Sequence, residues 1–133
     1  MGRTRTSVAA GIVLDAGALI ALDRGDKRMI ALLQRALTQG RAFRVPAGVV
    51  GQAWRDGRMQ VTLARFLRSE EVEIVPLDEQ LARSCGELCG ATGSSDIIDA
   101  SVVILARQRR DPIVTGDPDD LRRLDPAAQI IPV

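Results

Sequence analysis

Residues 94–117 read SSDIIDASVVILARQRRDPIVTGD, and the rest of the chain can be understood from this stretch outward. Asp96 and Asp99 stand at the start of a strongly apolar segment that we expect to be a helix, and Asp117 follows a short apolar strand. The apolar residues between 97 and 105 point around most of the helix circumference, which predicts a largely buried helix. An ionised aspartate in such a place is costly unless it is paired, hydrogen-bonded or bound to a metal.

Two interpretations of these acids are open from the stretch alone. Asp96 and Asp99 lie about 60° apart on a helix of ~3.6 residues per turn, so they share a face and repel each other. A hard divalent ion such as Mg²⁺ or Mn²⁺ would remove that repulsion. Alternatively, Ser94 or Ser95 caps the helix and the acids only stabilise its first turn. Asp117 and the proline after it are likewise typical of a helix start.

Length, composition and charge limit the classes of protein to which the chain can belong. Its 133 residues, 46% of them apolar, suit one globular domain over 1–133, with a mobile arm over 1–7. No apolar run approaches the ~20 residues of a membrane span, and the first residues do not read as a signal peptide, so we expect a cytoplasmic protein with no membrane partner. The net charge of +1, from 18 basic and 17 acidic residues, argues against an obligate nucleic-acid coat.

The chain contains no histidine, and this narrows the chemistry most. Imidazole bases, Ser-His and Cys-His nucleophile pairs and His-ligated metals are all excluded. Cys85 and Cys89 lie four residues apart in a predicted helix, and no further Cys or His completes a zinc site around them. Any hydrolytic chemistry must therefore use carboxylates.

Strands and helices alternate along the sequence. The strand-like runs are 8–14, 42–45, 72–77, 113–115 and 129–133. Besides the apolar helix of the opening stretch, helical patterns cover 16–22, 26–38, 46–54, 59–68, 78–90 and 117–124. This alternation predicts an α/β fold, with a parallel sheet covered by helices on both faces.

Sheet topology brings distant polar residues to one edge. Ligands of open parallel sheets bind beyond the carboxyl ends of the strands, where the strand order reverses. Asp15 follows the first strand and Asp117 the fourth, and the helix leading into the fourth strand must begin at the same edge with Asp96 and Asp99. Gln52, early in the helix after the second strand, projects to the same rim. This convergence favours a metal site over helix capping alone.

Four motifs carry a resemblance to a known family. They are VLD at 13–15 followed by AGALIAL, VPA at 45–47, SDIIDA at 95–100 and VTGDPDDL at 114–121. Together they resemble the PIN-domain nucleases and, more narrowly, the VapC toxins of bacterial toxin–antitoxin pairs, over about residues 8–133. The resemblance implies a three-layer α/β/α sandwich with a four- or five-stranded parallel sheet, and a Mg²⁺- or Mn²⁺-dependent ribonuclease.

The resemblance also implies the site residues. The catalytic and metal-binding residues that it implies are Asp15, Asp96, Asp99 and Asp117, where Asp96 matches an additional acid often found before the third family ligand. Gln52 and Thr115 are candidates for contacting substrate or orienting the site. Family members usually carry a Glu in the helix after the second strand, where this chain has Gln52. An amide has no charge to hold a second cation, so the number of metals stays open.

The implied partners are a cognate VapB-like antitoxin, an RNA substrate and a second copy in a homodimer. The alternative is a catalytically weakened PIN-like module that acts by binding RNA or an antitoxin, and Gln52 keeps it open. Arg24, Arg55 and Arg58 fall near loops that we assign to the acidic edge, so they are candidate phosphate contacts, with ordinary surface arginine as the other interpretation.

Two other folds that collect acids around Mg²⁺ on a parallel sheet do not match. A phosphoacceptor receiver domain needs adjacent acids after the first strand and a late lysine, whereas the only lysine here is Lys27. A phosphatase of the haloacid dehalogenase type needs Asp-x-Asp after that strand, and residues 15–17 read Asp-Ala-Gly.

Overall fold

A computed structural model describes residues 10–133 of the protein, and the arm expected over 1–7 lies outside them. Five strands form one sheet in the order β3-β2-β1-β4-β5, and every neighbouring pair is parallel. The strands are β1 (Gly11–Leu14), β2 (Ala42–Pro46), β3 (Val72–Val75), β4 (Ile113–Thr115) and β5 (Ile130–Pro132). The expected α/β fold with a parallel sheet is confirmed, with five strands.

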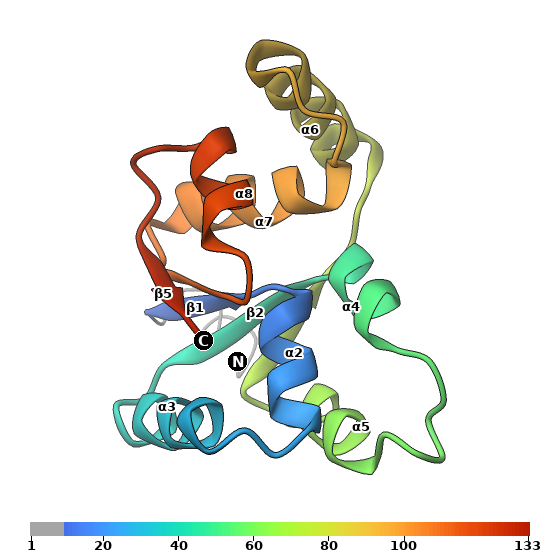
Figure 1. The fold of residues 1–133 in the computed structure, drawn as a ribbon, viewed down its shortest axis with the longest axis vertical. Helices are drawn as coiled ribbons and strands as arrows, with labels where there is room; N and C mark the ends of the chain where they lie inside the picture. The colour runs from blue at the N-terminus through green and yellow to red at the C-terminus, as the bar shows by residue number, and fades with distance from the viewer. Residues whose placement is uncertain (1–9) are drawn as a thin grey trace.

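Helices cover both faces of this sheet (Figure 1). One face carries α2 (Ala16–Asp23), α3 (Lys27–Thr38) and α5 (Val61–Leu67), and the other carries α7 (Ile97–Arg109) and α8 (Pro118–Leu124). The short helix α4 (Ala47–Ala53) follows β2 directly, and α6 (Glu79–Thr92) packs on α7 at the end of the molecule. Strand order reverses between β1 and β4, so the ligand-binding edge expected for such sheets lies where these two strands end.

The central helix α7 is buried along its middle, from Ala100 to Ala106, as its apolar sequence predicts. On the other face of the sheet, the rings of Phe43 in β2 and Phe66 in α5 pack with centroids 5.5 Å apart. The core therefore lies on both sides of β1 and β2 and holds their carboxyl ends in place.

Element boundaries differ from the sequence prediction where side chains or prolines intervene. Pro46 does not open a helix: it is the last residue of β2, paired with Val75, and α4 begins at Ala47. Helix α5 begins at Val61 instead of Met59, because the side chain of Gln60 is used to hold the preceding loop. Helix α6 runs past Gly90 to Thr92 and is capped by Gly93, whose φ of 73° is the left-handed conformation that glycine adopts easily.

A buried ion pair ties the amino edge of the sheet together. Arg44 in β2 is 1% exposed, and one of its terminal nitrogens lies 2.7 Å from a carboxylate oxygen of Asp111, just after α7. Its Nε lies 3.4 Å from Glu73 in β3. Asp111 also accepts a hydrogen bond from the backbone N–H of Gly11, where a Cβ would fall 1.7 Å from the guanidinium. Glycine at position 11 is thus what lets Arg44 cross β1.

Within residues 10–133, no single helix combines the length and apolarity needed to cross a membrane. Helices α6 and α7 have that length and apolarity only when they are taken together, and the two are bent by 105° relative to each other.

Candidate functional site

Asp15 lies at the carboxyl end of β1 and is 6% exposed. Its carboxylate caps α2 by accepting a hydrogen bond from the backbone N–H of Ala18, 2.9 Å away. The other carboxylate oxygen accepts a short hydrogen bond from the hydroxyl of Thr115 at the end of β4, and the N–H of Gly116 lies 3.4 Å from the first oxygen. One carboxylate therefore joins the ends of β1 and β4.

Thr115 is fully buried and holds the next acid in turn. Its hydroxyl oxygen accepts a hydrogen bond of 2.8 Å from the backbone N–H of Asp117. Asp117 occupies the cap position of α8, yet its side chain accepts no capping hydrogen bond from that helix. The capping explanation, which suits Asp15, does not apply to Asp117.

Two glycines let these elements approach one another. A Cβ on Gly17, in the first turn of α2, would lie 2.8 Å from the Cα and the N of Gly116. A Cβ on Gly116 would lie 3.1 Å from the Cα of Gly17. Because the obstructing atoms at position 17 are backbone, no side-chain rotation can make room for a larger residue. This backbone contact brings the start of α2, with Asp15, against the turn that carries Asp117.

The start of α7 supplies the remaining predicted acids. Asp96, not Ser94 or Ser95, is the cap: its side chain accepts a hydrogen bond of 2.9 Å from the backbone N–H of Asp99. Ser94 instead accepts a hydrogen bond from the N–H of Asp96. The thiol of Cys89 in α6 reaches the carbonyl of Asp96 at 3.6 Å, so α6 helps to hold this turn.

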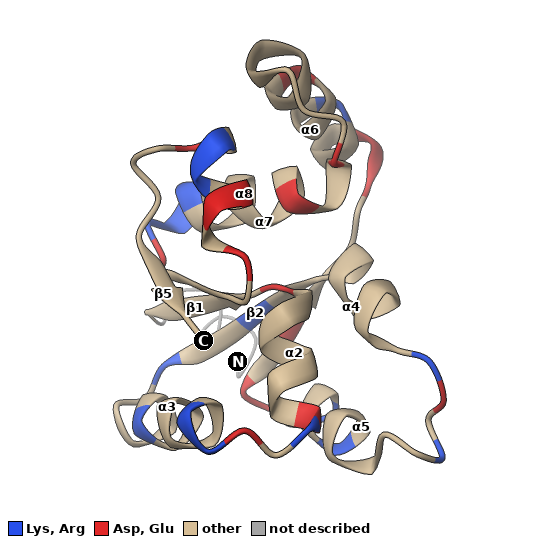
Figure 2. Ribbon diagram, viewed as in Figure 1, with Lys and Arg blue, Asp and Glu red and all other residues tan. Residues whose placement is uncertain are grey.

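The electrostatics of Asp99 connect the two halves of the site. Partial burial and the negative charges of Asp96, Asp120 and Asp15 raise the pKa of Asp99 to about 7. These acids come from three places in the chain and act on one carboxyl group, so they lie within electrostatic reach of each other. Figure 2 shows acidic segments at the starts of α7 and α8 and at the end of β1, toward the same edge of the sheet.

Asp120 belongs to this cluster and was not among the predicted site residues. A hydrogen bond with Asp117 and the charge of Asp117 raise its pKa, and Arg123 acts in the opposite direction. The signal in the sequence was its spacing: Asp120 follows Asp117 by three residues, as Asp99 follows Asp96. In the sequence the same residue reads as an ordinary acid in the first turn of a helix.

Gln52 lies in α4 and is partly exposed. Its side chain makes no hydrogen bond with any other residue of the described range 10–133. Helix α4 nevertheless packs against the start of α7, because a Cβ on Gly48 would lie 3.0 Å from Ile98. The start of α4 is thus beside the start of α7, and Gln52, further along α4, makes no hydrogen bond to the acids.

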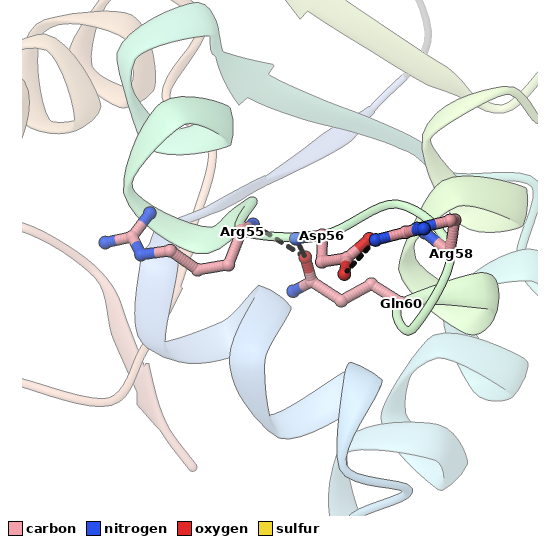
Figure 3. A network of polar contacts seen from close by, with 4 residues as sticks. All are labelled: Arg55, Asp56, Arg58 and Gln60. Atoms are coloured by element: carbon pink, nitrogen blue, oxygen red, sulfur yellow. Dashed lines mark hydrogen bonds and ion pairs between the residues drawn. The ribbon is translucent and has the colours of Figure 1, made fainter.

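Two of the candidate phosphate contacts have local partners (Figure 3). Gln60 accepts hydrogen bonds from the backbone N–H groups of Arg55 and Asp56 at 2.7 and 3.0 Å. The guanidinium of Arg55 donates to the carbonyls of Gly51 and Trp54, and Arg58 pairs with Asp56 at 3.4 Å.

Arg24, the third candidate phosphate contact, lies at the end of α2 that is away from the acidic edge. Arg24 caps the C-terminus of α2, whereas the acidic edge lies at the N-terminus of that helix, where Asp15 stands. Our assignment of Arg24 to the acidic edge was therefore wrong, because an eight-residue helix carries the chain about 12 Å away.

Carboxylate oxygens are the ligands that Mg²⁺ and Mn²⁺ prefer, so the donor set fits such an ion. As the carboxylates are oriented here, no three His, Cys, Asp or Glu side chains of residues 10–133 converge closely enough to hold one. The carboxylates of Asp15 and Asp96 are instead engaged with backbone N–H groups. No lysine or arginine in this range forms an ion pair with Asp15, Asp96, Asp99 or Asp117, so their negative charge is not compensated by the described chain.

A comparison with known proteins identifies the family that has this fold and site. The family model for the PIN domain matches residues 12–126, from β1 to the residue pair after α8. The chain belongs to the PIN-domain family. No curated protein matches the sequence. The motif resemblance, which spans nearly the same residues, is therefore confirmed at the level of the family.

Solved structures share the fold of this PIN domain at low sequence identity. VapBC2 from Rickettsia felis, bound to a DNA fragment from its promoter, matches with a TM-score of 0.68 and 16% identity over 92% of this chain and 98% of its own. VapC20 from Mycobacterium tuberculosis, a Sarcin-Ricin loop cleaving toxin, has a TM-score of 0.61 and 17% identity over 82% and 93%. FitAcB from Neisseria gonorrhoeae has a TM-score of 0.61 and 18% identity over 90% and 96%. The likeness to VapC-type folds expected from the motifs is confirmed.

Proposed function

We propose that this PIN domain is a metal-dependent endoribonuclease that acts as the toxin of a cytoplasmic toxin–antitoxin pair. The observation that supports this most is Asp99, whose pKa is raised to about 7 by burial and by the charges of Asp96, Asp120 and Asp15. A carboxyl group in such surroundings takes up a proton or a cation readily at neutral pH. The cluster lies where the strand order reverses, the usual ligand edge of an open parallel sheet.

In this proposal Mg²⁺ or Mn²⁺ is held by Asp15, Asp96, Asp99 and Asp117. When bound, such an ion neutralises charge on the scissile phosphodiester and supplies a water of lowered pKa. Thr115 and Gly116 keep the carboxylate of Asp15 in one orientation through their hydrogen bonds. One of these carboxylates would accept the proton of the attacking water.

Gln52 bears on the number of ions. Its amide offers an oxygen or a hydrogen bond but no charge, and it lies in α4, the helix whose Gly48 packs against Ile98 at the start of α7. We therefore propose a single-ion site in which Gln52 contacts the substrate. The same residue supports the alternative function, a catalytically weakened PIN module that acts by binding RNA or an antitoxin.

The partners in this proposal are an RNA substrate, a VapB-like antitoxin and a second copy of the chain. Two of the structures with this fold support the first two partners. VapC20, a Sarcin-Ricin loop cleaving toxin, supports an RNA substrate. VapBC2, bound to a DNA fragment from its promoter, supports a VapB-like antitoxin. The homodimer rests on the motif resemblance.

The test is cleavage of a labelled single-stranded RNA by the purified chain across a titration of Mg²⁺ and of Mn²⁺. We expect Asp99→Asn to reduce the rate by at least about a hundredfold, as loss of a group that stabilises charge in the reaction does. The matched control is Glu79→Gln, which removes an exposed acid from the first turn of α6 and should leave the rate unchanged.

Equal cleavage by the natural chain and Asp99→Asn would overturn the proposal. If the natural chain binds Mn²⁺ but cleaves nothing, Gln52→Glu decides between the two functions. Gain of cleavage in that variant would establish that the natural chain is the weakened binding module.

A further inference from the structure

Five arginines gather where α7 and α8 end, and we call this the α7–α8 arginine surface. It consists of Arg107, Arg109, Arg110, Arg122 and Arg123, all of them exposed. The two helices pack together, and Arg107 in the last turn of α7 pairs at 3.4 Å with Asp125, the residue after α8. Figure 2 shows the basic ends of both helices together, away from the acidic starts of the same helices.

Helix stabilisation explains only part of this surface. Cations near the C-terminus of a helix interact favourably with its dipole, and Arg107 and Arg109 qualify in α7. Arg110 has a φ of 58°, a left-handed position where glycine is the usual residue. Beside it, a hollow of about 410 Å³ is lined by Arg107 and Arg110, with Asp111 and Asp125. Both acids already have arginine partners, Asp111 in Arg44 and Asp125 in Arg107.

Positive charge is in excess on the α7–α8 arginine surface. Arg122 pairs with Asp119 at 3.7 Å and Arg123 with Asp120 at 2.8 Å. Arg109 and Arg110 form no ion pair with any acid of residues 10–133. A partner for this surface therefore has to be an anion.

The surface is continuous with the acidic site. Arg123 is bonded to Asp120, and the charge of Asp120 is one of those acting on Asp99. Helix α8 has seven residues, so it spans about 10 Å from the acids at its start to the arginines at its end. A flexible polyanion that crosses the acidic site can reach the arginines without leaving the α7 and α8 side of the sheet.

An acidic site that acts on RNA needs cations beside it. Its uncompensated carboxylates repel phosphates, whereas affinity for nucleic acid comes mainly from Lys and Arg contacts to the backbone. Arg24 lies at the far end of α2, and Arg55 and Arg58 are bonded within their own loop (Figure 3). Arg109 and Arg110 differ from them, because neither forms an ion pair within residues 10–133. We propose that the α7–α8 arginine surface binds the phosphate backbone of single-stranded RNA next to the acidic site, an inference that rests on the proposed RNA substrate.

The experiment measures binding of a fluorescent single-stranded RNA by anisotropy, in EDTA and at several salt concentrations. The test variant is Arg109→Gln with Arg110→Asn, the two arginines of this surface that form no ion pair within residues 10–133. Asparagine suits the left-handed backbone of residue 110. The control is Arg28→Gln with Arg35→Gln, two exposed arginines of α3 on the opposite face of the sheet. Thermal melting of each variant identifies any that are unfolded, and Arg122→Gln in the last turn of α8 provides a second test at the same surface.

We expect the test variant to weaken binding about five- to tenfold at low salt and to reduce the slope of log K against log salt by about 1.4, or ~0.7 per lost phosphate contact. The control should keep the natural slope. Equal losses in test and control, or none in either, would overturn the inference. So would polyglutamate of similar length binding as tightly as RNA, because the surface would then be selective for an acidic protein.

This result is separable from the cleavage test. Binding in EDTA does not depend on catalysis, and Asp99→Asn should bind RNA at least as well as the natural chain. Arginine-dependent binding without any cleavage would support this inference and contradict the proposed nuclease function.

Discussion

Two clusters of charged side chains lie at opposite edges of the parallel sheet, and they differ in how their charge is compensated. At the amino edge, buried Arg44 lies between Asp111 and Glu73, so opposite charges meet within the chain. At the carboxyl edge, Asp15 and Asp99 share a cluster in which Arg123 pairs only with Asp120. Compensated charge is typical of a structural role, whereas uncompensated charge of one sign indicates a place for an ion or a charged ligand.

The difference extends to the glycines at each edge. Gly11 makes room for a side chain, since a Cβ there would meet the guanidinium of Arg44. Gly17 makes room for backbone, since a Cβ there would meet Gly116. The first glycine lets a buried ion pair form, and the second brings together two segments that carry carboxylates. Both are structural requirements, but only the second sets the spacing of the acidic cluster.

The largest effect on stability is expected from breaking the compensated cluster. Arg44→Met leaves Asp111 buried without its cation, which should lower the free energy of unfolding by about 3–5 kcal/mol in urea titration. Arg44→Met combined with Asp111→Asn should recover part of that loss. Arg83→Met breaks an exposed pair with Glu79 and should cost no more than about 1 kcal/mol. A double variant as unstable as the single one would contradict the assigned role of this pair.

The uncompensated cluster should respond in the opposite way. Asp117→Asn should lower the affinity for Mn²⁺ about a hundredfold by titration calorimetry, at the upper end of effects seen for groups around bound metals. The free energy of unfolding without metal should stay the same or rise, because like-charge repulsion is relieved. Asp119→Asn, two residues further along the chain, is the control and should leave Mn²⁺ binding unchanged. Loss of stability in Asp117→Asn without loss of metal affinity would indicate a structural carboxylate.

Substitution of Gly17 tests the spacing between the two acidic segments. Gly17→Ala should lower the free energy of unfolding by about 1–3 kcal/mol, because the added Cβ overlaps backbone of Gly116. Mn²⁺ affinity should fall as well, since Asp117 moves with Gly116. The control is Gly86→Ala, where the added Cβ meets open space in α6 and should stabilise the protein by up to about 1 kcal/mol. A Gly17→Ala variant that keeps its Mn²⁺ affinity would show that the glycine contact does not set this spacing.

Lowering the pH tests Asp99 with the smallest perturbation. Because its pKa is about 7 in the folded chain and 3.8 ordinarily, Asp99 binds more proton folded than unfolded between about pH 4 and pH 7. Its contribution to stability in the absence of metal is therefore favourable at low pH and is lost as the pH rises toward 7. Metal needs the ionised carboxylate, so Mn²⁺ affinity should fall about fivefold from pH 7 to pH 6.

Asp99→Asn is the reference for both measurements. In this variant the urea midpoint should change less with pH between about pH 4 and pH 7 than in the natural chain. Its remaining Mn²⁺ affinity should no longer fall between pH 7 and pH 6. If the urea midpoint and the Mn²⁺ affinity change with pH equally in the natural chain and the variant, Asp99 is not the titrating group.

Much of the fold could be predicted because local patterns carry it. Helix α3 begins after Asp26 and ends before Gly40, as its cap and its left-handed glycine predict. The start of α5 could not be predicted, because the apolar period of residues 59–68 does not reveal that Gln60 bonds to the loop before it. The Arg44 cluster was missed for a similar reason: an arginine inside a short apolar strand has no visible partner until Asp111, 67 residues away, is placed beside it.

For the site, the sequence by itself determined which acids end strands and begin helices, and so the edge at which Asp15 and Asp117 lie. Only the tertiary structure decided what each carboxylate does there. Asp96 caps its helix, Asp117 leaves its helix uncapped, and Asp120 joins the cluster that raises the pKa of Asp99. The reason is physical: residue spacing sets direction within one element, whereas burial, charge repulsion and the close contact of α2 with the β4–α8 turn depend on distances between elements that the chain reaches only when folded.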